Sequence, residues 1–361
     1  MDTISFLAKD WNAFVAQISR FIDLDATAAS FKALQRRRGV KDASSLLRLG
    51  LGYGPCGLSL RQAAAWAEVT GVASLANTSL LDRLRNSSDW FAEIVRSLMS
   101  DRIKPTNSYY DGRTIKLIDG SSISEPGSKG TDWRLHAAYD LGSGQFSHIK
   151  VTDQHTAESL THAPVQAGDI LIADRGYAKA ADLLAVNQQG GDFIVRIGWR
   201  SLRLLNCDGK VFDLFGKLSS DSGDGAVDVS VMIAPRKGRP ALPVRLILLK
   251  KPDGATEQEQ RRVERRSNRN QHQIDPRTLI AAGYVMIVTS LAADAFPAHE
   301  VAALYRLRWQ IEIAFKRLKS ILHIDRLRAY DPDLAKSWIY CHIIAALAID
   351  RMSQEILESS P

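Results

Sequence analysis

The stretch DILIADRGYAKAADLLAVNQQGGDFIVRI, residues 169–197, changes its hydrophobic pattern twice. It opens with a strand, 169–177, that is apolar up to an aspartate, continues with the helical pattern AKAADLLAVN and ends with the strand DFIVRI. An uninterrupted apolar strand is typical of the centre of a sheet, where both faces are covered. The stretch therefore predicts a strand–helix–strand unit and an α/β fold.

Three shorter runs precede this unit, and each ends in aspartate: TIKLID (114–119), LHAAYD (135–140) and HIKVTD (148–153). They are typical of half-buried strands. Gly142 and Gly144 predict a hairpin turn between the second and third runs. Together with the central unit, these runs predict a mixed sheet flanked by helices, with a weakly marked helix between the third and fourth strands.

Residues 1 to about 105 have helical patterns throughout. From Ser59 onward, two short helical segments are separated by a turn at Gly71, and Arg83 and Arg85 follow on the second segment. This spacing is that of a DNA-binding helix-turn-helix. A small packed helical bundle explains the pattern equally well.

From about Gly198 to Ala282 the sequence provides strands instead of the next helix. The strands predicted in this part and just after it are KVFDLF (210–215), AVDVSVMIA (226–234), VRLILLK (244–250) and YVMIVTS (284–290). The chain then continues as one long predicted helix, PAHEVAALYRLRWQIEIAFKRLKSIL, residues 297–322.

The chain of 361 residues carries a net charge of +7 with a pI of about 9.3, which favours a polyanionic partner. Cys56, Cys207 and Cys341 are isolated from one another, so the sequence predicts neither a zinc site nor a disulfide framework, and a reducing cytoplasm is expected. The longest strongly apolar run, 338–349, is too short to span a bilayer. We therefore expect a cytoplasmic protein without a membrane partner.

Within the long predicted helix, the segment 305–319 holds five Lys or Arg residues and a single carboxylate, Glu312. At ~100° per residue, Tyr305, Arg308, Glu312 and Lys319 share one edge of the helix, within an arc of roughly 60°. The apolar stripe that borders and anchors this edge consists of Leu304, Leu307, Ile311, Phe315, Leu318 and Leu322. A lone acid on such a basic edge favours a metal ligand over a solvated charge.

Asp119 and Asp174 each follow an apolar run at the carboxyl end of a predicted strand. Taken singly, each is explained by turn or helix-cap chemistry. Because ligands of α/β sheets bind at this edge, the two aspartates and Glu312 can instead converge on an all-oxygen site of the kind that Mg²⁺ prefers. Two ions about 3.5–4 Å apart would support phosphoryl transfer, and the surrounding cations would hold a nucleic-acid backbone.

With these residues, the chain resembles bacterial insertion-sequence transposases of the Asp-Asp-Glu type, in the class with a Tyr-Arg-Glu-Lys signature. Tyr305, Arg308, Glu312 and Lys319 match the signature, with two, three and six residues between them. IDGSS and ADRGY resemble the family's first and second aspartate motifs. The resemblance covers roughly residues 105–350.

The resemblance implies a retroviral-integrase-like RNase H fold: an α/β catalytic core with a β-rich insertion, preceded by an N-terminal helical domain. The implied domains are residues 1–105 (helical, with the helix-turn-helix candidate), 106–198 (first part of the core), 199–282 (β-rich insertion with a basic run) and 283–361 (second part of the core and C-terminal helices).

The activity implied by the resemblance is metal-dependent cleavage at the ends of the element, followed by joining of the freed 3′-OH to target DNA. Mg²⁺, or Mn²⁺ as a substitute, would be held as two ions by Asp119, Asp174 and Glu312. The implied partners are transposon-end DNA, target DNA and a second copy of the chain, because cutting two ends requires at least a dimer in the synaptic complex. A bacterial, nucleoid-associated location is expected.

The resemblance also implies a row of DNA contacts. Tyr305, Arg308 and Lys319 would contact phosphates near the transposon terminus. Trp309 would stack on an unpaired base or else pack as a core or interface aromatic.

Other candidates lie outside this row. Arg175 and Tyr177 would reach the DNA backbone, hold the neighbouring site groups in place without touching the substrate, or serve packing. His155 and Glu158 are predicted to be structural because their spacing matches no metal motif. A basic run is usually a solvated face, but beside a DNA-processing site it favours backbone contact without sequence specificity. Its arginines are Arg261, Arg262, Arg265, Arg266 and Arg269.

Two other functions remain open at this point. A non-catalytic DNA-binding regulator of transposition would keep the helices and basic surfaces but would not need three aligned acids. A nuclease with an RNase H-like fold would keep the acids but would not need the signature row. The intact Asp119, Asp174 and Glu312, together with that row, favour the transposase.

Overall fold

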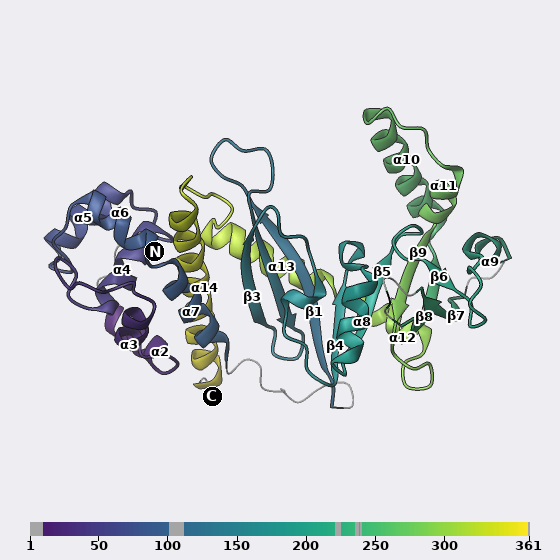
Figure 1. Ribbon diagram of the computed structural model, residues 1–361, viewed down its shortest axis with the longest axis horizontal. Helices are drawn as coiled ribbons and strands as arrows, with labels where there is room; N and C mark the ends of the chain where they lie inside the picture. Colours follow the sequence, from purple (N-terminus) through teal and green to yellow (C-terminus); the bar gives the residue numbers. More distant parts are fainter. Residues whose placement is uncertain (1–9, 101–111, 221–224, 235–237, 239, 360–361) are drawn as a thin grey trace.

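The computed structural model describes residues 10–100, 112–220, 225–234, 238 and 240–359. The predicted domain boundary near residue 105 lies outside these residues. The molecule is elongated: the N-terminal helices lie at one end, the sheet occupies the middle, and a helical arm formed by residues 253–282 projects at the other end (Figure 1).

Helices form the described chain before the sheet, as predicted. They are α2 (Trp11–Ser19), α3 (Leu24–Ser30), α4 (Ala43–Tyr53), α5 (Leu60–Val69), α6 (Asn77–Arg85) and α7 (Ser88–Met99). A capping box begins α5, in which Ser59 and Gln62 exchange side-chain and backbone hydrogen bonds. Gly71, with φ of +70°, makes the turn after this helix. The two predicted helices and the turn at Gly71 are therefore present, but residues 70–76 between α5 and α6 make a longer connection than the three- to four-residue turn of a helix-turn-helix. The helix-turn-helix assignment and DNA binding by it stay predictions.

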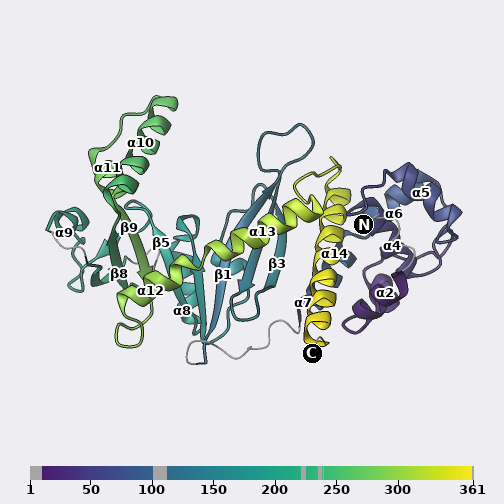
Figure 2. The same ribbon diagram turned by 180° about the vertical axis from the view of Figure 1, so that it is seen from behind.

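The last helix, α14 (Pro332–Ser359), packs against α7, α4 and α6 (Figure 2). Ser337 on α14 donates a hydrogen bond to the carbonyl oxygen of Leu84 on α6, at 2.5 Å. One hydrophobic cluster contains Trp90 of α7, Trp338 of α14 and residues of the sheet. The N-terminal helices therefore share their core with the rest of the chain. None of the described helices has the length and apolar character that crossing a bilayer requires.

A nine-stranded mixed sheet runs through the molecule in the order β3-β2-β1-β4-β5-β9-β8-β7-β6. β1, β4 and β5 are parallel neighbours, and the other pairings are antiparallel. The strands are β1 (Thr114–Ile123), β2 (Trp133–Asp140), β3 (Gln145–Asp153), β4 (Asp169–Ala173), β5 (Asp192–Ile197), β6 (Leu204–Leu205), β7 (Val227–Ile233), β8 (Leu242–Lys250) and β9 (Tyr284–Thr289). The predicted mixed α/β sheet is confirmed.

Helices cover both faces of this sheet (Figures 1 and 2). α8 (Ala180–Gln188) packs against one face, and α12 (Ala298–Arg306) and α13 (Trp309–Leu322) pack against the other. The chain also forms α9 (Leu214–Ser220), α10 (Asp253–Arg269) and α11 (Pro276–Ala282), of which α10 extends away from the sheet. Ile115 and Leu117 of β1 pack in the cluster of Phe315 on α13, whereas Ile118 packs in the cluster of Leu183 on α8. Because side chains alternate along a strand, the odd-numbered residues of β1 face α13.

Two details of the predicted sheet are wrong. No α-helix separates β3 from β4, since the described connection contains only a 3₁₀ turn, η2 (Leu160–His162). The segment 210–215 is not a strand, because Asp213 accepts a hydrogen bond from Gly216 N at 2.9 Å and its following residues start α9. The strands β6 to β8 continue the main sheet through β9.

The long helix predicted for residues 297–322 is also divided, into α12 and α13. At the junction, Arg308 N donates to the carbonyl oxygen of Tyr305 at 3.1 Å, and Ile311 N donates to that of Arg308 at 3.3 Å. These three-residue hydrogen bonds tighten the backbone locally into a 3₁₀ turn. Leu307 and Arg308 keep right-handed helical dihedrals, so the two helices continue one another across the sheet (Figure 2).

Candidate active site

Asp119 lies where the parallel pairing of β1 with β4 ends, at Ile118 opposite Ala173. The prediction that it ends a strand is wrong, because β1 continues to Ile123 while it remains paired with β2. As an odd-numbered residue of β1, Asp119 belongs to the face covered by α13. The pleat of the strand therefore directs this carboxylate toward the helix that carries Glu312.

Asp174 follows β4 directly and begins a 3₁₀ turn, η3 (Arg175–Tyr177). Its Oδ1 accepts a hydrogen bond from Gly176 N at 2.7 Å. Asp174 thus performs the capping role that turn chemistry predicted. A carboxylate has two oxygens and about four lone-pair sites, so this cap leaves acceptor capacity for a second role.

Arg308 joins the strand acid to the helix acid. Its Nη1 lies 3.6 Å from Asp119 Oδ2, and its Nη2 donates a hydrogen bond to Glu312 Oε1. Burial by itself would lower the pKa of Arg308. The interactions of this guanidinium with Glu312, Tyr305 and Asp119 outweigh burial, so its pKa is raised. Residues nearly 200 positions apart in the chain therefore meet at one edge of the sheet.

The charge environment of Asp119 shows that all three acids lie close enough to interact. Burial raises the pKa of Asp119 to about 6. The hydrogen bond from Gly120 N, at 2.8 Å, and the charge of Arg308 lower it, whereas the charges of Asp174 and Glu312 raise it further. The protein thus concentrates more negative charge here than Arg308 offsets.

This donor set fits a hard divalent cation. Among the described side chains, no group of three or more His, Cys, Asp and Glu residues is arranged to hold a metal ion directly. Mg²⁺ does not require such a cage, because it binds through one or two carboxylates and keeps several waters. A cation beside Asp119 would stabilise the ionised form of this carboxyl, which burial disfavours.

A hollow of about 640 Å³ adjoins Asp119 and Glu312 and is lined on its other side by basic residues. Lys319, from the predicted phosphate row, is one of them. Lys316 and Arg326 also line the hollow, although the sequence patterns did not single them out. Lys316 was detectable, because it follows Glu312 by one helical turn. Arg326 could not be detected in the sequence, because it is brought to the hollow by the pairing of its backbone with that of Ser124, which lies far away in the chain.

The predicted phosphate row is divided between two helices. Tyr305 lies on α12, Arg308 caps α13, and Glu312 and Lys319 lie on α13. Burial raises the pKa of Tyr305, and its hydroxyl interacts with Arg308. Trp309 is 53% exposed, so it is not a core aromatic, while base stacking and packing at an interface both stay predictions.

The structure places Arg175 and Tyr177 in different environments, one exposed and the other buried. Arg175 is exposed, and its aliphatic part lies against Gly198. Tyr177 is only 1% exposed and packs among the residues of α8 and the sheet. This burial favours the packing role for Tyr177 over a contact with the DNA backbone.

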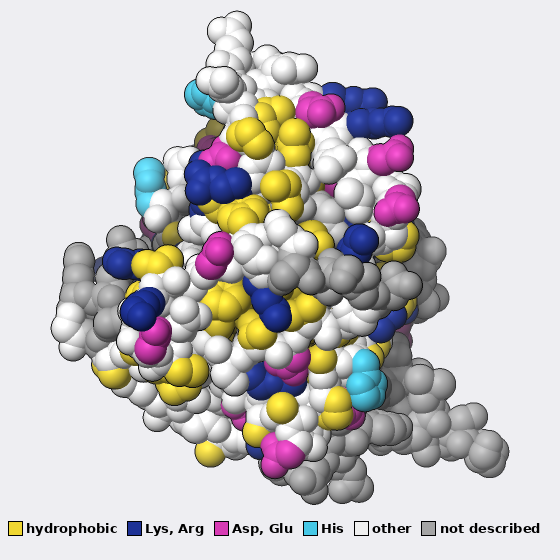
Figure 3. Space-filling view, turned by 90° about the vertical axis from the view of Figure 1, so that its right-hand side faces the viewer, with side chains coloured by type: hydrophobic (Ala, Val, Ile, Leu, Met, Phe, Trp, Pro, Cys, Tyr) yellow, Lys and Arg dark blue, Asp and Glu magenta, His cyan; other side chains and the backbone are white. Residues whose placement is uncertain are grey.

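The basic run forms most of the exposed helix α10, whose end projects away from the sheet (Figure 1). Acidic residues share this helix: Glu257 lies 3.5 Å from Arg261, and Glu259 lies 3.8 Å from Arg262. Figure 3, which views the molecule from this end, shows Lys and Arg side chains interspersed with Asp and Glu. The arm therefore offers separate arginines and not one continuous basic surface.

Carboxylates at the edge of an α/β sheet, beside a basic helix, are the features of enzymes that transfer phosphoryl groups on nucleic acids. Residues 110–348 match the family model described as "Transposase DDE domain". This match spans more than half of the chain, so the chain belongs to this transposase family.

Named relatives agree with this assignment. The chain is 41% identical to the putative transposase InsL for insertion sequence element IS186A of Escherichia coli K12, over 99% of this chain and 98% of the relative. It is also 41% identical to the transposase for insertion sequence element IS421 of Escherichia coli, with the same coverage. The transposase for IS231F of Bacillus thuringiensis subsp. israelensis is 22% identical, over 94% of this chain and 79% of the relative.

Proposed function

We propose that this transposase cuts DNA at the ends of its own insertion sequence and joins the freed 3′-OH to target DNA. The observation that carries the proposal is the double contact of Arg308, which places Asp119 of β1 beside Glu312, on the helix that also carries Lys319. Metal-binding acids and phosphate-binding cations are thereby combined in one place. The Tyr-Arg-Glu-Lys spacing supports assignment to the class with that signature.

In this proposal Asp119, Asp174 and Glu312 bind the divalent cations. Two Mg²⁺ ions, or Mn²⁺ in their place, would activate the attacking water or hydroxyl and stabilise the leaving oxygen. Arg308 orients Glu312 and contributes a planar guanidinium for a phosphate oxygen pair, while Lys319 acts as a point charge.

We further propose an RNase H-like catalytic core. The three antiparallel strands β1–β3, followed by the parallel strands β4 and β5, support it, since Asp119 lies on β1 beside β4 and Asp174 follows β4 directly. Residues 106–198 and 283–361 would form this core, 199–282 its β-rich insertion and 1–105 the N-terminal helical domain. Two copies of the chain would act together, since two DNA ends must be cut.

The direct test uses DNA that carries the sequences flanking the gene for this protein. End-labelled DNA is incubated with the purified chain in Mg²⁺, Mn²⁺ or EDTA. We expect cuts at the element boundary and joined products in either metal, and neither in EDTA. Binding without cutting would identify a regulator, and cutting without joining would identify a nuclease.

Trp309 should contribute to binding of unpaired DNA ends. Its exposed indole next to Arg308 is placed to stack on a base, and such stacking contributes about 1–3 kcal/mol per base. We expect Trp309→Ala to weaken binding of DNA with an unpaired terminal base, measured by fluorescence anisotropy, more than that of fully paired duplex. Trp309→Phe should retain most of the affinity. Equal losses on both DNAs would contradict stacking.

The arginines of α10 should contribute binding without sequence preference. For every phosphate that an arginine neutralises, its removal should reduce the slope of log K against log salt by about one. We expect replacement of Arg261, Arg262, Arg265, Arg266 and Arg269 by Gln to weaken binding of end DNA and unrelated DNA equally and to flatten the salt dependence. Glu257→Gln with Glu259→Gln, on the same helix, is the opposite-sign control and should not weaken binding. An unchanged slope would show that the arm does not touch DNA.

A further inference from the structure

Glu158 lies beside the glycines of both aspartate motifs. A methyl group on Gly176 would come 2.5 Å from Glu158 Oε2 and 3.2 Å from Asp174 Oδ1. A methyl group on Gly120, which follows Asp119, would come 3.5 Å from Glu158 Oε1. Glycine at these two positions therefore leaves room for a fourth carboxylate at the edge of the sheet where Asp119 and Asp174 lie.

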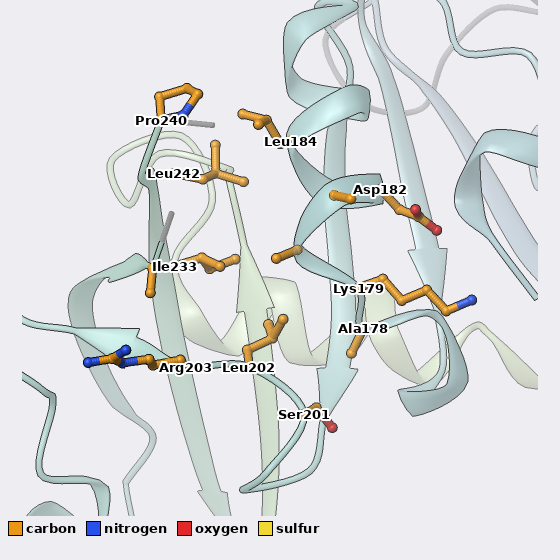
Figure 4. A pocket seen from close by; sticks show the side chains of 13 residues that line it. Ala178, Lys179, Asp182, Leu184, Ser201, Leu202, Arg203, Ile233, Pro240 and Leu242 are labelled. Carbon is orange, nitrogen blue, oxygen red and sulfur yellow. The ribbon is translucent and has the colours of Figure 1, made fainter. Parts of the chain in front are cut away.

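Helix α8 holds the backbone of Glu158 in place. Lys179 Nζ donates a hydrogen bond to the carbonyl oxygen of Glu158, and Asp182 Oδ2 accepts one from Leu160 N at 3.3 Å. Figure 4 shows Lys179 and Asp182 pointing away from Leu242, on the far side of a neighbouring hollow of about 850 Å³. These two side chains thus fix the segment after β3 against α8 and leave the carboxylate of Glu158 free to face the motif glycines.

The carboxylate of Glu158 is paired only loosely with a cation. Arg134 Nε lies 3.9 Å from Glu158 Oε1, and the side chain of Glu158 is 34% exposed. Such a pair leaves most of the acceptor capacity of the carboxylate available. The backbone of Glu158 is therefore held in place, whereas no short hydrogen bond from another described residue engages its carboxylate oxygens.

Tyr177 provides an independent indication of a ligand. Its side chain is 1% exposed, and its hydroxyl has no hydrogen-bond partner among the described atoms. The hydroxyl lies 3.3 Å from the methyl position on Gly120. A buried hydroxyl without a partner is costly and calls for a polar occupant.

We propose that Glu158 and Tyr177 bind the water shell of a divalent cation held at Asp119 and Asp174. The inference rests on the proposed function and extends it to two residues that act as positioning groups. Mg²⁺ keeps several waters, so a carboxylate and a phenol can hold it without touching it. This positioning role replaces the purely structural role that spacing predicted for Glu158.

The test measures Mn²⁺ binding to the full chain without DNA, by electron paramagnetic resonance titration. Loss of a group that holds a metal ligand or its water shell lowers metal affinity by about 10–100-fold. We expect Glu158→Gln and Tyr177→Phe each to weaken one Mn²⁺ site by at least about tenfold. The midpoint of thermal unfolding in EDTA should stay within a few degrees of the unchanged protein. Glu264→Gln, an exposed carboxylate on α10, is the charge control and should not alter the affinity.

Gly176→Ala tests the same geometry without removing a functional group. Its methyl would displace the flexible end of Glu158, so the variant should lose Mn²⁺ affinity as Glu158→Gln does, and combining the two should add little. Wild-type affinity in Glu158→Gln, while Asp174→Asn loses a site, would overturn the inference alone. Wild-type affinity in Asp174→Asn would overturn the proposed metal centre and the inference together.

Discussion

Replacement of Glu312 by Gln is expected to abolish DNA cleavage and strand transfer while leaving DNA binding intact. The change keeps the size of the side chain and removes the negative charge that would hold a cation. A loss of at least about 10³-fold in the cleavage rate, equivalent to about 4 kcal/mol of transition-state stabilisation, is expected. Cleavage of end-labelled DNA in Mg²⁺ and Mn²⁺ measures the rate, and a gel-shift titration measures binding.

The fold should survive this substitution. Glu312 has a side chain that is 53% exposed, and it pairs with Arg308 on the same helix. Glu300→Gln on α12 is a matched control, since it removes one carboxylate from the adjoining helix and should leave cleavage unchanged. Cleavage at the wild-type rate by Glu312→Gln would remove Glu312 from the metal site.

Asp119→Asn is expected to abolish cleavage and, in the metal-free protein, to increase stability. Burial and the neighbouring acids raise the pKa of Asp119 from its ordinary value of 3.8 to about 6. The ionised form is therefore disfavoured in the folded state, at a cost of up to about 3 kcal/mol. Asparagine carries no charge and avoids this cost, although it cannot replace the carboxylate as a metal ligand.

The pH dependence gives this prediction a definite sign. The folded protein binds a proton at Asp119 more readily than the unfolded chain does, so this carboxyl favours folding most below about pH 4. That contribution is lost as pH rises through about 6. The free energy of unfolding, measured in urea with EDTA, should therefore be higher for Asp119→Asn than for the unchanged protein at pH 8. The two values should converge below pH 4. If Asp119→Asn is less stable than the unchanged protein at pH 8, the ionised form of Asp119 is not disfavoured in the folded state.

The two aspartate substitutions also separate activity from folding. Both Asp119→Asn and Asp174→Asn should be inactive if the acids share the cations. Asp174 also caps η3 through Gly176 N, and asparagine can retain that hydrogen bond. A difference in stability between the two variants would therefore report on burial, whereas a common loss of cleavage reports on chemistry.

Much of this protein follows from local patterns. The predicted strand DFIVRI coincides with β5, because a short, largely apolar run that is bounded by glycines is typical of a buried strand. The apolar stripe from Leu304 to Leu322 is buried or half-buried, since residues at helical spacing share one face. The two aspartates were found because short apolar runs lead into them. The signature spacing placed Glu312 in the same site.

Only the tertiary structure decided the rest, because it depends on contacts between residues far apart in the chain. Pairing with β2 carries β1 past Asp119, and pairing of β9 with β5 and β8 joins the insertion strands to the main sheet. The contact of Arg308 with Asp119, the burial of Tyr177 and the position of Glu158 beside two glycines also arise only on folding. Periodicity determines which face of an element is apolar, whereas burial, charge and neighbours depend on what packs against that face.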